Sequence, residues 1–462
     1  MPTAQSYTPD PRILELGDAF YDAVEPARFP KCQPRFLNRK SAESVGLDLD
    51  DEAWAQHFCR FESLPGNLQK PLALRYHGHQ FRVYNPEIGD GRGFTFAQLR
   101  DLSGRLLDLG TKGSGQTPYS RTADGRLTLK GGVREVLATE MLEALGVNTS
   151  KTFALFETGE ELVRGDEPSP TRSSVLTRLS HGHVRIGTFQ RLAFYGEVEN
   201  INVLVRYCLK HLYGEQPAEE ANENAVRLFG LVSGATARLA ASYLAAGFVH
   251  GVLNSDNINV TGESFDYGPW RFTPYWDPDF TAAYFDHYGL YSFGRQPEAI
   301  QWDLAQFAGC MSLVTDAPPL SEELGRWSDR FEEKLVDALL RRLGVERRDK
   351  DDRELAAALL RALQSREAPI DRVFFDWRGG SDPGEERYPS PAFRELAARL
   401  KDRQRPRTHP YWSDTEPCSM HIEEVEEIWS AIADRDDWSP FEEKVSAIRR
   451  MGDAMSQDGV TA

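Results

Sequence analysis

The sequence predicts an α+β chain of two lobes, with a strand-rich first half and a helix-rich second half. Before about residue 190, short apolar runs alternate with polar residues, and only one stretch has the spacing of a well-marked helix. Beyond about residue 195, apolar residues recur every three or four positions in one segment after another. Strands followed by helices are typical of an α+β fold, and 462 residues exceed what one simple core holds.

Composition and charge restrict the classes of function. Hydrophobic residues make up 40% of the chain and charged residues 27%, which is typical of a soluble globular protein. The net charge of −17 argues against a basic surface for nucleic acid. The N-terminus has no apolar stretch typical of a signal peptide, and the most apolar run, 239–253, is too short to span a bilayer. We expect a cytoplasmic, monomeric enzyme with no nucleic-acid or membrane partner.

The cysteines predict neither a disulfide framework nor a cysteine zinc site. They are odd in number, widely spaced and without a CxxC motif, which favours a reducing compartment. The five are Cys32, Cys59, Cys208, Cys310 and Cys418.

We divide the chain into three parts. Residues 1–70 are punctuated by proline and have only short helical patterns, at about 14–23 and 50–58, so we interpret them as an extension packed on the core. Residues 71–190 form the expected N-lobe, and residues 191–462 the helical C-lobe.

In the N-lobe, the runs 94–100 and 105–112 alternate in polarity around a short turn with glycine, which predicts a hairpin. A helix is expected over 133–145, where Gly146 ends it. The remaining strands expected there are a hairpin of 151–156 with 161–164, and a strand at 174–179.

In the C-lobe, helical spacing begins at 201 and continues almost to the end of the chain. The expected helices cover about 201–213, 224–246, 297–314, 320–344, 352–365, 391–403, 421–434 and 439–451.

A polar loop at 250–268 follows the helix 224–246 and is the strongest candidate for a functional site. It begins His250-Gly-Val-Leu-Asn-Ser-Asp-Asn, continues into a short expected strand at 258–260, and closes with Asp266-Tyr-Gly268. Asn257 and Asp266 supply two oxygen donors, which suits a hard divalent cation that also binds phosphate oxygens. The alternative is a polar turn that needs no metal.

A glycine-rich stretch, Gly89-Asp-Gly-Arg-Gly93, is a candidate for phosphate binding. The glycines Gly89 and Gly91 let backbone amides approach phosphate oxygens, and Arg92 adds charged donors. A tight turn before a strand is the alternative explanation.

Lys112 ends an expected strand, and Glu135 lies on the helix that follows. A lysine held by a carboxylate is typical of nucleotide-phosphate binding, although Glu140 on the same helix competes for the role. Arg178 and Arg185 lie where the two halves meet and could clamp phosphates, or form ordinary surface ion pairs.

Two His-Gly-His segments supply four imidazoles, so a zinc site is a further alternative. Because no cysteine lies nearby and each pair lies in a glycine loop, we favour hydrogen-bonded histidines. The four are His77, His79, His181 and His183.

The polar loop also matches a motif of the small-molecule branch of the kinase superfamily. These phosphotransferases carry HGDxxxxN, whose Asp is the base and whose Asn binds magnesium, followed by a DFG-like Asp. His250, Asn257 and Asp266 are in register with that form, but Val252 occupies the place of the base. Since valine cannot accept a proton, Asp256 is the alternative carboxylate.

With these motifs in order, the chain resembles the selenoprotein O family of pseudokinases, most strongly from about 75 to 310. The matching motifs are Arg75-Tyr76, Gly78-His-Gln-Phe81, Gly89-Asp-Gly-Arg92, Lys112-Gly113, Gln116-Thr-Pro-Tyr-Ser-Arg121, Asp124-Gly-Arg126, Arg134-Glu135, His183-Val-Arg185, His250-Gly-Val252, Asp256-Asn257, Asp266-Tyr-Gly-Pro269 and Gln296-Pro297 before Trp302.

The resemblance implies a protein-kinase-like two-lobed fold and Mg²⁺-dependent transfer of AMP from ATP to Ser, Thr or Tyr hydroxyls of proteins, with pyrophosphate released. Mn²⁺ is an alternative metal. The family binds ATP flipped relative to ordinary kinases. By motif, Asp256 would be the base, Asn257 and Asp266 would hold the metal, and Glu135 would pair with Lys112. The implied nucleotide-binding residues are Gly89, Gly91, Arg92, Lys112, Asp124, Gly125, Arg178, Arg185 and Asp266.

Two other functions stay open from the sequence. One is an atypical phosphotransferase in which Asp256 replaces the missing base. The other is a non-catalytic pseudokinase that binds nucleotide and a protein partner. The family often carries a Cys or selenocysteine near its C-terminus, whereas the last cysteine here is Cys418.

Overall fold

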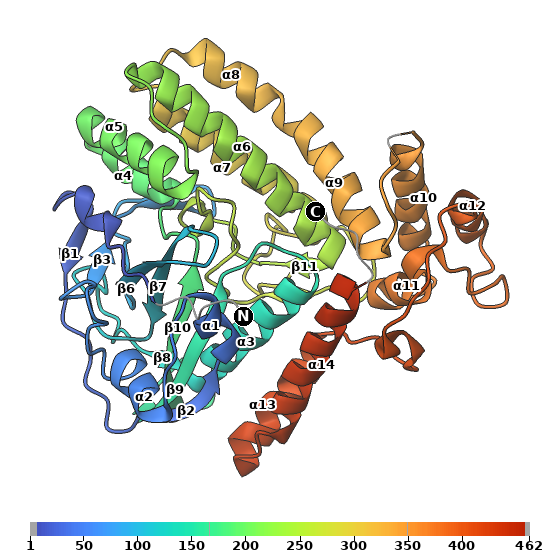
Figure 1. The fold of residues 1–462 in the computed structure, drawn as a ribbon, viewed down its shortest axis with the longest axis horizontal. Coiled ribbons are helices and arrows are strands. Elements are labelled where there is room, and N and C mark those ends of the chain that lie inside the picture. Colours follow the sequence, from blue (N-terminus) through green and yellow to red (C-terminus); the bar gives the residue numbers. More distant parts are fainter. Residues whose placement is uncertain (1–6, 166, 349, 458–462) are drawn as a thin grey trace, which may run out of the picture.

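The computed structural model describes residues 7–165, 167–348 and 350–457 (Figure 1). The α+β prediction is confirmed, because the first half is built on a sheet and the second half is helical. The sheet has eight strands in the order β1-β3-β6-β7-β10-β9-β2, with β8 paired to β10. Their bounds are β1 Tyr21–Ala23, β2 Gln33–Leu37, β3 Leu72–Leu74, β6 Thr95–Arg100, β7 Leu106–Lys112, β8 Leu127–Thr128, β9 Lys151–Leu162 and β10 Thr171–Ser180.

Two small hairpins lie outside this sheet, β4 (Gly78–Gln80) with β5 (Val83–Asn85) and β11 (Phe248–Val249) with β12 (Arg271–Phe272). The helices are α1 Arg39–Ser44, α2 Asp51–Phe58, α3 Leu129–Ala144, α4 Ile186–Phe194, α5 Val198–Tyr207, α6 Ala221–Ala246, α7 Gln296–Met311, α8 Ala317–Gly325, α9 Trp327–Leu343, α10 Asp352–Gln364, α11 Ile370–Asp376, α12 Pro391–Leu400, α13 Ile422–Arg435 and α14 Ser439–Gln457.

The first 70 residues supply both edges of the sheet, since β1 pairs with β3 and β2 pairs with β9. The helix at 50–58 is confirmed as α2, and its buried Trp54 packs on Phe153 of β9 with ring centroids 4.9 Å apart. The helical pattern at 14–23 is wrong. A short 3₁₀ turn ends at Glu15, and Gly17 then takes a positive φ of 82°, which frees the following residues to pair as β1.

The prediction of a hairpin of 151–156 with 161–164 is also wrong, because residues 151–162 form the single long strand β9. Gly159, between the two expected strands, has φ 76° and lies at an irregularity in the pairing of β9 with β10. The partner of β9 in the hairpin is therefore β10, and the predicted strand at 174–179 lies inside β10. The hairpin of 94–100 with 105–112 is confirmed as β6 and β7.

Helix α6 is the central helix of the second half and ends at Gly247, whose φ of 69° is typical of a helix C-terminus. By length and composition α6 is the one helix among the described residues that could cross a membrane. Its most apolar window is 72% buried inside the protein, so α6 is a core helix. The helix expected at 320–344 is divided at Arg326 into α8 and α9.

The strand expected at 258–260 does not form. Instead, the backbone of this segment bridges to residues 184–186, with Ile186 N donating to Ile258 O over 2.9 Å and Val260 N donating to Val184 O over 3.0 Å. These bonds join the polar loop to the segment that follows β10.

The last two helices return to the strand-rich half, where α14 runs beside α3 (Figure 1). The Arg449 guanidinium on α14 donates to both carboxylate oxygens of Glu140 on α3, over 2.7 and 2.8 Å. Lys130 at the start of α3 pairs with Glu426 of α13 over 2.7 Å. The helix α3 is thus held between the sheet and the C-terminal helices.

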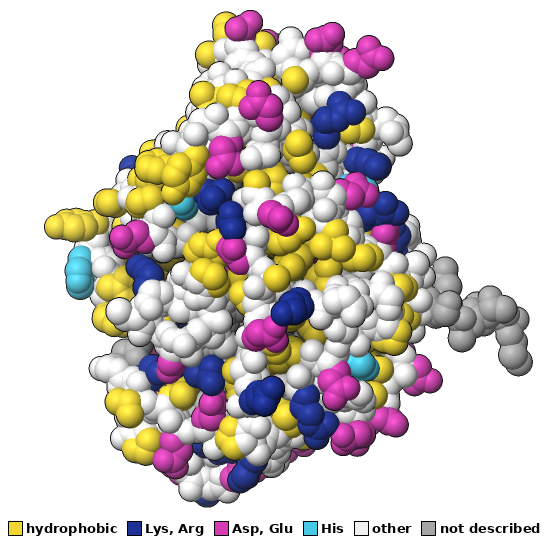
Figure 2. Space-filling view, turned by 90° about the vertical axis from the view of Figure 1, so that its left-hand side faces the viewer, with side chains coloured by type: hydrophobic (Ala, Val, Ile, Leu, Met, Phe, Trp, Pro, Cys, Tyr) yellow, Lys and Arg dark blue, Asp and Glu magenta, His cyan; other side chains and the backbone are white. Residues whose placement is uncertain are grey.

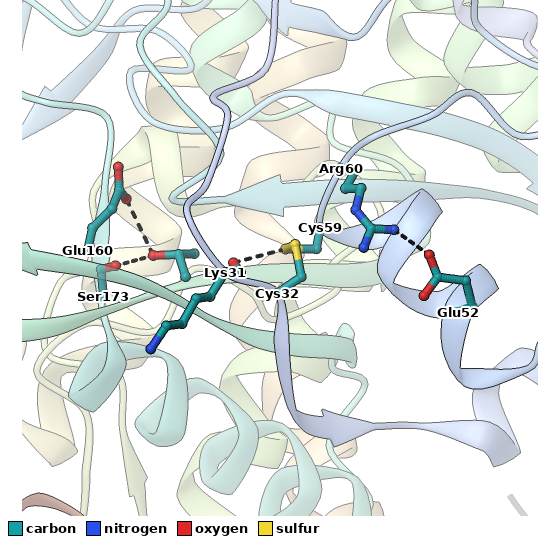
Figure 3. Close-up of a disulfide and its surroundings, with 8 residues drawn as sticks. Lys31, Cys32, Glu52, Cys59, Arg60, Glu160 and Ser173 are labelled. Atoms are coloured by element: carbon teal, nitrogen blue, oxygen red, sulfur yellow. Dashed lines mark hydrogen bonds and ion pairs between the residues drawn. A yellow bond between two sulfur atoms is a disulfide. The ribbon is translucent and has the colours of Figure 1, made fainter.

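The expectation of no disulfide is wrong for one pair of cysteines. Cys32 and Cys59 are bonded, with Cα atoms 5.9 Å apart, and they join the residue before β2 to the residue after α2 (Figure 3). Their separation of 27 residues carries no motif, because the packing of α2 against the sheet brings them together. Cys208, Cys310 and Cys418 are free thiols.

The face shown in Figure 2 is mixed in charge, with acidic and basic side chains interspersed with hydrophobic ones.

Candidate active site

The candidate site forms where β7, β10, α3 and the polar loop meet. Lys112 at the end of β7 forms an ion pair with Glu135 of α3, and its Nζ lies 2.9 Å from Asp266 Oδ1. All three side chains are wholly or largely buried. Of the two glutamates on α3 that competed for Lys112, Glu135 faces the site and Glu140 faces α14.

Asp266 is surrounded by cations. Besides Lys112, Arg178 Nη1 lies 3.3 Å from Asp266 Oδ1, and Arg185 Nη1 lies 3.7 Å from Oδ2. Burial raises the pKa of the Asp266 carboxyl, but Lys112, Arg178 and Arg185 outweigh burial and hold the pKa well below its usual value. Asp266 also has a positive φ of 64°, a conformation that aspartate tolerates better than most residues.

Arg185 spans the two ends of the polar loop. Its Nη1 donates to the backbone carbonyl of Asp256 over 3.0 Å, while its guanidinium carbon lies 4.2 Å above the Tyr76 ring. Arg178 lies over the Phe265 ring at 5.1 Å. Both guanidinium groups are buried, which is costly without anions. The arrangement is therefore suited to binding a polyanion.

Asp256 contrasts with Asp266. It lies in a 3₁₀ turn, Ser255–Asn257, is 8% exposed, and its Oδ1 is buried without a hydrogen-bond partner among the described residues. Burial, opposed by the charge of Arg185, raises the pKa of Asp256 to about 7. A carboxyl group with a pKa near neutrality is matched to accepting a proton.

The small hairpin β4–β5 covers the turn that contains Asp256, a contact that sequence reasoning did not predict. His79 N donates to Ser255 Oγ over 2.7 Å, and Phe81 N donates to Asn254 Oδ1 over 3.0 Å. A Cβ at Gly78 would lie 2.7 Å from Asp256 Oδ1, so only glycine lets the hairpin approach this closely. The Gly78-His-Gln-Phe81 motif marks this hairpin in the sequence, but the turn that it covers lies over 170 residues away, so the contact could not be predicted.

Asn257 donates from Nδ2 to the backbone carbonyl of Val252 over 3.0 Å. This bond orients the amide and directs its donor toward the loop's own backbone. The amide oxygen of Asn257 and the carboxylate of Asp266 are the donor types that Mg²⁺ prefers.

The glycine-rich stretch Gly89–Gly93 packs closely on the end of β7 and the segment after it. Gly113 N donates to Arg92 O over 2.7 Å, and a Cβ at Gly93 would lie 2.1 Å from Thr111 O. Gly91 O accepts from Ser120 Oγ. Gly89 lies against the ring of Tyr119, where a Cβ would come within 2.5 Å of the ring. The charge of Arg92 contributes to the low pKa of Asp266, so this stretch belongs to the same site.

Asp124 and Gly125 lie farther along the loop after β7. Asp124 pairs with Arg164, with nitrogen–oxygen distances of 2.8 and 3.0 Å, and accepts from Arg126 N over 2.9 Å. Gly125 has φ 70° and accepts from Gly115 N through its carbonyl over 3.1 Å. The structure thus places this pair in a structured loop and not in the cation cluster around Asp266.

The zinc alternative is not supported. Within the described part of the chain no group of three or more His, Cys, Asp or Glu side chains could hold a metal ion. The histidines have other partners: His77 Nδ1 lies 2.8 Å from Tyr84 Oη, His79 Nδ1 lies 2.7 Å from Gln190 Nε2, and His183 Nδ1 lies 3.1 Å from Asp108 Oδ2.

Comparison with known proteins agrees with this geometry. The family model described as Protein adenylyltransferase SelO matches residues 4–404. A Synechocystis protein named protein nucleotidyltransferase YdiU is 39% identical over 96% of this chain and 98% of its own length. The Gloeobacter violaceus protein of that name is 41% identical, covering 96% of this chain and 95% of its own. The Pseudomonas putida one is 35% identical over 83% and 78%. The family match contains every candidate residue above, and α13 and α14 lie beyond it.

Proposed function

Because the chain belongs to the protein adenylyltransferase SelO family, we propose that it transfers AMP from ATP to hydroxyl side chains of proteins. The protein is a nucleotidyltransferase with the two-lobed, protein-kinase-like fold of that family. The finer assignment to Ser, Thr and Tyr acceptors, and to the residues below, is our proposal.

The transfer is a substitution at the α-phosphorus of ATP. The acceptor oxygen forms a bond to that phosphorus, the bond to the bridging oxygen of the β-phosphate breaks, and pyrophosphate leaves. The hydroxyl proton goes to Asp256, whose Oδ1 has no hydrogen-bond partner among the described residues and whose pKa is about 7. This unpartnered oxygen is the observation that carries the proposal, because Val252 leaves the usual kinase base position without an acceptor.

The cation cluster binds the phosphates. Lys112, Arg178 and Arg185 all point at Asp266, so their charges converge on one small volume. Arg92 and the backbone of Gly89 and Gly91 add donors from the glycine-rich stretch. Asp124 and Gly125 complete the proposed nucleotide-binding set from the loop after β7. Holding the phosphates in a water-poor site strengthens each of these interactions.

Asn257 and Asp266 fit a divalent cation by their chemistry, since both offer oxygen donors and Asp266 is ionised. A Mg²⁺ or Mn²⁺ ion held there would neutralise phosphate charge and act as a Lewis acid. Only two side chains are proposed as ligands, which suits an ion whose other ligands are water and phosphate oxygens.

The decisive experiment compares two labelled forms of ATP. With Mg²⁺ and a protein acceptor, label on the α-phosphate should appear on protein, and label on the γ-phosphate should not. Transfer of γ-label would instead establish the atypical phosphotransferase. ATP-dependent thermal stabilisation with no transfer of either label would favour the non-catalytic pseudokinase. Intact-mass spectrometry separates the AMP and phosphate adducts directly.

Protein acceptors and ATP are the partners of this reaction. We also propose that the protein acts as a monomer in the cytoplasm, where ATP is available. The Cys32–Cys59 disulfide removes the argument for this compartment from cysteine spacing. Size-exclusion chromatography with light scattering tests the first point and cell fractionation the second.

A further inference from the structure

Behind Arg178 lie two buried polar side chains, His183 and Asp108, to which the reaction above assigns no role. Arg178 Nε lies 3.2 Å from His183 Nε2, and His183 Nδ1 lies 3.1 Å from Asp108 Oδ2. At its other end Arg178 Nη1 donates to Asp266 Oδ1 over 3.3 Å. His183 is 5% exposed and Asp108 2%. An unbroken series of polar contacts therefore runs from Asp108 to Asp266, and Asp108, His183 and Arg178 in it are buried.

The pairing of β7 with β10 brings these groups together. Alternate residues of β7 share one face of the sheet, so Asp108, Gly110 and Lys112 point the same way. Gly110 is the register partner of Arg178. A Cβ at Gly110 would lie 2.4 Å from His183 Cε1 and Nε2, so the imidazole reaches Arg178 only because this residue is glycine.

The hydrogen-bonding capacities of the three groups fix the proton on the imidazole. A guanidinium group has only donors, so Nε2 of His183 must present its lone pair to Arg178. A neutral imidazole that accepts at Nε2 carries its proton on Nδ1, which then donates to Asp108. Burial, and after it the charge of Arg178, lower the pKa of His183 against the opposing effect of Asp108, so the ring is neutral at pH 7.

Asp108 is itself held in place. Gln98 Nε2 donates to Asp108 Oδ1 over 2.7 Å, which leaves Oδ2 for the imidazole. The carboxylate is therefore oriented from a residue on β6, in the interior of the sheet.

We propose that Asp108 and His183 are positioning residues for Arg178. Asp108 holds His183 in the Nδ1–H tautomer, and Nε2 of His183 then accepts from Arg178 Nε and aims the Nη groups at the ATP phosphates. The inference rests on the proposed function, in which Arg178 binds phosphate. Because the guanidinium is already held in one orientation, ATP binding does not have to be offset by the loss of its conformational entropy.

The test exploits the tautomer. In Asp108→Asn, the amide oxygen accepts from Gln98 and the amide NH₂ faces Nδ1 of His183. Nδ1 must then accept, so the imidazole proton moves to Nε2, where it and the Arg178 Nε–H are two donors facing each other. We expect the Kd of MgATP, measured by calorimetry on the full chain, to rise by about 10- to 100-fold. His183→Gln keeps an acceptor for Arg178 and has no tautomer, so its Kd should stay within about 3-fold of wild type.

The double variant Asp108→Asn/His183→Gln separates positioning from general destabilisation. Because glutamine can present its oxygen to Arg178 whatever residue 108 is, the double variant should bind MgATP about as well as His183→Gln alone. Asp376→Asn serves as a matched control. Asp376, at the end of α11, is another buried carboxylate, and it accepts a hydrogen bond from Tyr388 Oη over 2.7 Å. This variant should lower the melting temperature without changing the Kd.

Two results would overturn the inference: a Kd within about 2-fold of wild type in Asp108→Asn, or a double variant that binds more weakly than either single variant. Where Asp108→Asn does not fold, His183→Phe decides, because it keeps the ring shape without the acceptor and must weaken MgATP binding far more than His183→Gln.

Arg178→Ala distinguishes the two proposals. Normal MgATP binding in that variant would refute the phosphate role of Arg178, whereas weak binding there with normal binding in Asp108→Asn would refute only the positioning role.

Discussion

Asp256 and Asp266 lie on the same buried loop, yet their surroundings differ in almost every respect. Asp266 faces three cations, and the pKa of its carboxyl is held well below the usual value. Asp256 Oδ1 has no hydrogen-bond partner among the described residues, and burial raises the pKa of this carboxyl to about 7. The difference shows that burial alone determines neither protonation nor role. Partners decide whether a buried carboxylate anchors charge or accepts a proton.

The largest effect is expected for Asp266→Ala, which leaves Lys112, Arg178 and Arg185 buried without their shared anion. We expect unfolding to require about 3–5 kcal/mol less and AMP transfer to fall by about 10³-fold or more. Thermal melts should also show that pyrophosphate stabilises the variant more than it stabilises wild type, because phosphate replaces the missing anion. A variant as stable as wild type would mean that the cation cluster does not depend on Asp266.

Asp256→Asn should lower AMP transfer without lowering stability. Removing the proton acceptor should lower transfer by about 10²- to 10³-fold, while MgATP binding and the melting temperature stay at least at the wild-type level. Rates with α-labelled ATP, combined with calorimetry, test this. The contrast with Asp266 would be lost if Asp256→Asn unfolded more easily than wild type.

Glu135→Gln weakens the anchor of Lys112 but leaves Asp266 in place, so a smaller effect is expected. Transfer should fall by about 10-fold, mainly through a higher KM for ATP. Glu140→Gln is the matched control on the same helix, since Glu140 pairs with Arg449 away from the site. It should change stability but leave the KM for ATP within about 2-fold of wild type, and equal effects of the two variants would contradict the assignment of Glu135.

Glu263 lies between Asp256 and Asp266 on the same loop and is also buried, so it tests whether burial alone reproduces the raised pKa of Asp256. Burial, opposed by a hydrogen bond from His181 N, raises its pKa from 4.5 to about 7. A raised folded-state pKa lowers stability as the pH rises from the unfolded value through 7, so wild type carries a penalty of about 3 kcal/mol at most at pH 8. Glu263→Gln should therefore melt higher than wild type at pH 8 and nearly equally at pH 4. Equal melting temperatures at both values would show that the carboxyl is not desolvated as described.

Local patterns predicted the elements better than their partners. The hairpin of β6 with β7, α2, α3 and α6 follow from periodicity and glycine ends. A glycine such as Gly159 suits a turn as well as an irregularity within a strand. It lies at an irregularity within β9, and only the pairing with the neighbouring strand distinguishes these two alternatives. Spacing alone could not choose between Glu135 and Glu140, because tertiary packing determines which face of α3 looks into the site.

The candidate site shows the same limit. The motifs identified Lys112, Asp256 and Asp266, since each lies in a recognisable local sequence. The β4–β5 cover over Asp256 and the contact of His183 with Asp108 join residues far apart in the chain. The disulfide of Cys32 with Cys59 was missed for that reason too. Such pairings are set by the sheet and not by spacing.

The position of α14 against α3 has a consequence for how the enzyme becomes active during synthesis. The helix α3 carries Glu135 on its inner face, and its outer face is held by Arg449 of α14. Glu140 and Arg449 are 309 residues apart in the chain, so during translation α3 lacks this support until α14 has left the ribosome. A nascent chain can thus assemble its sheet and polar loop well before α14 is there to hold the helix that carries the Lys112 anchor.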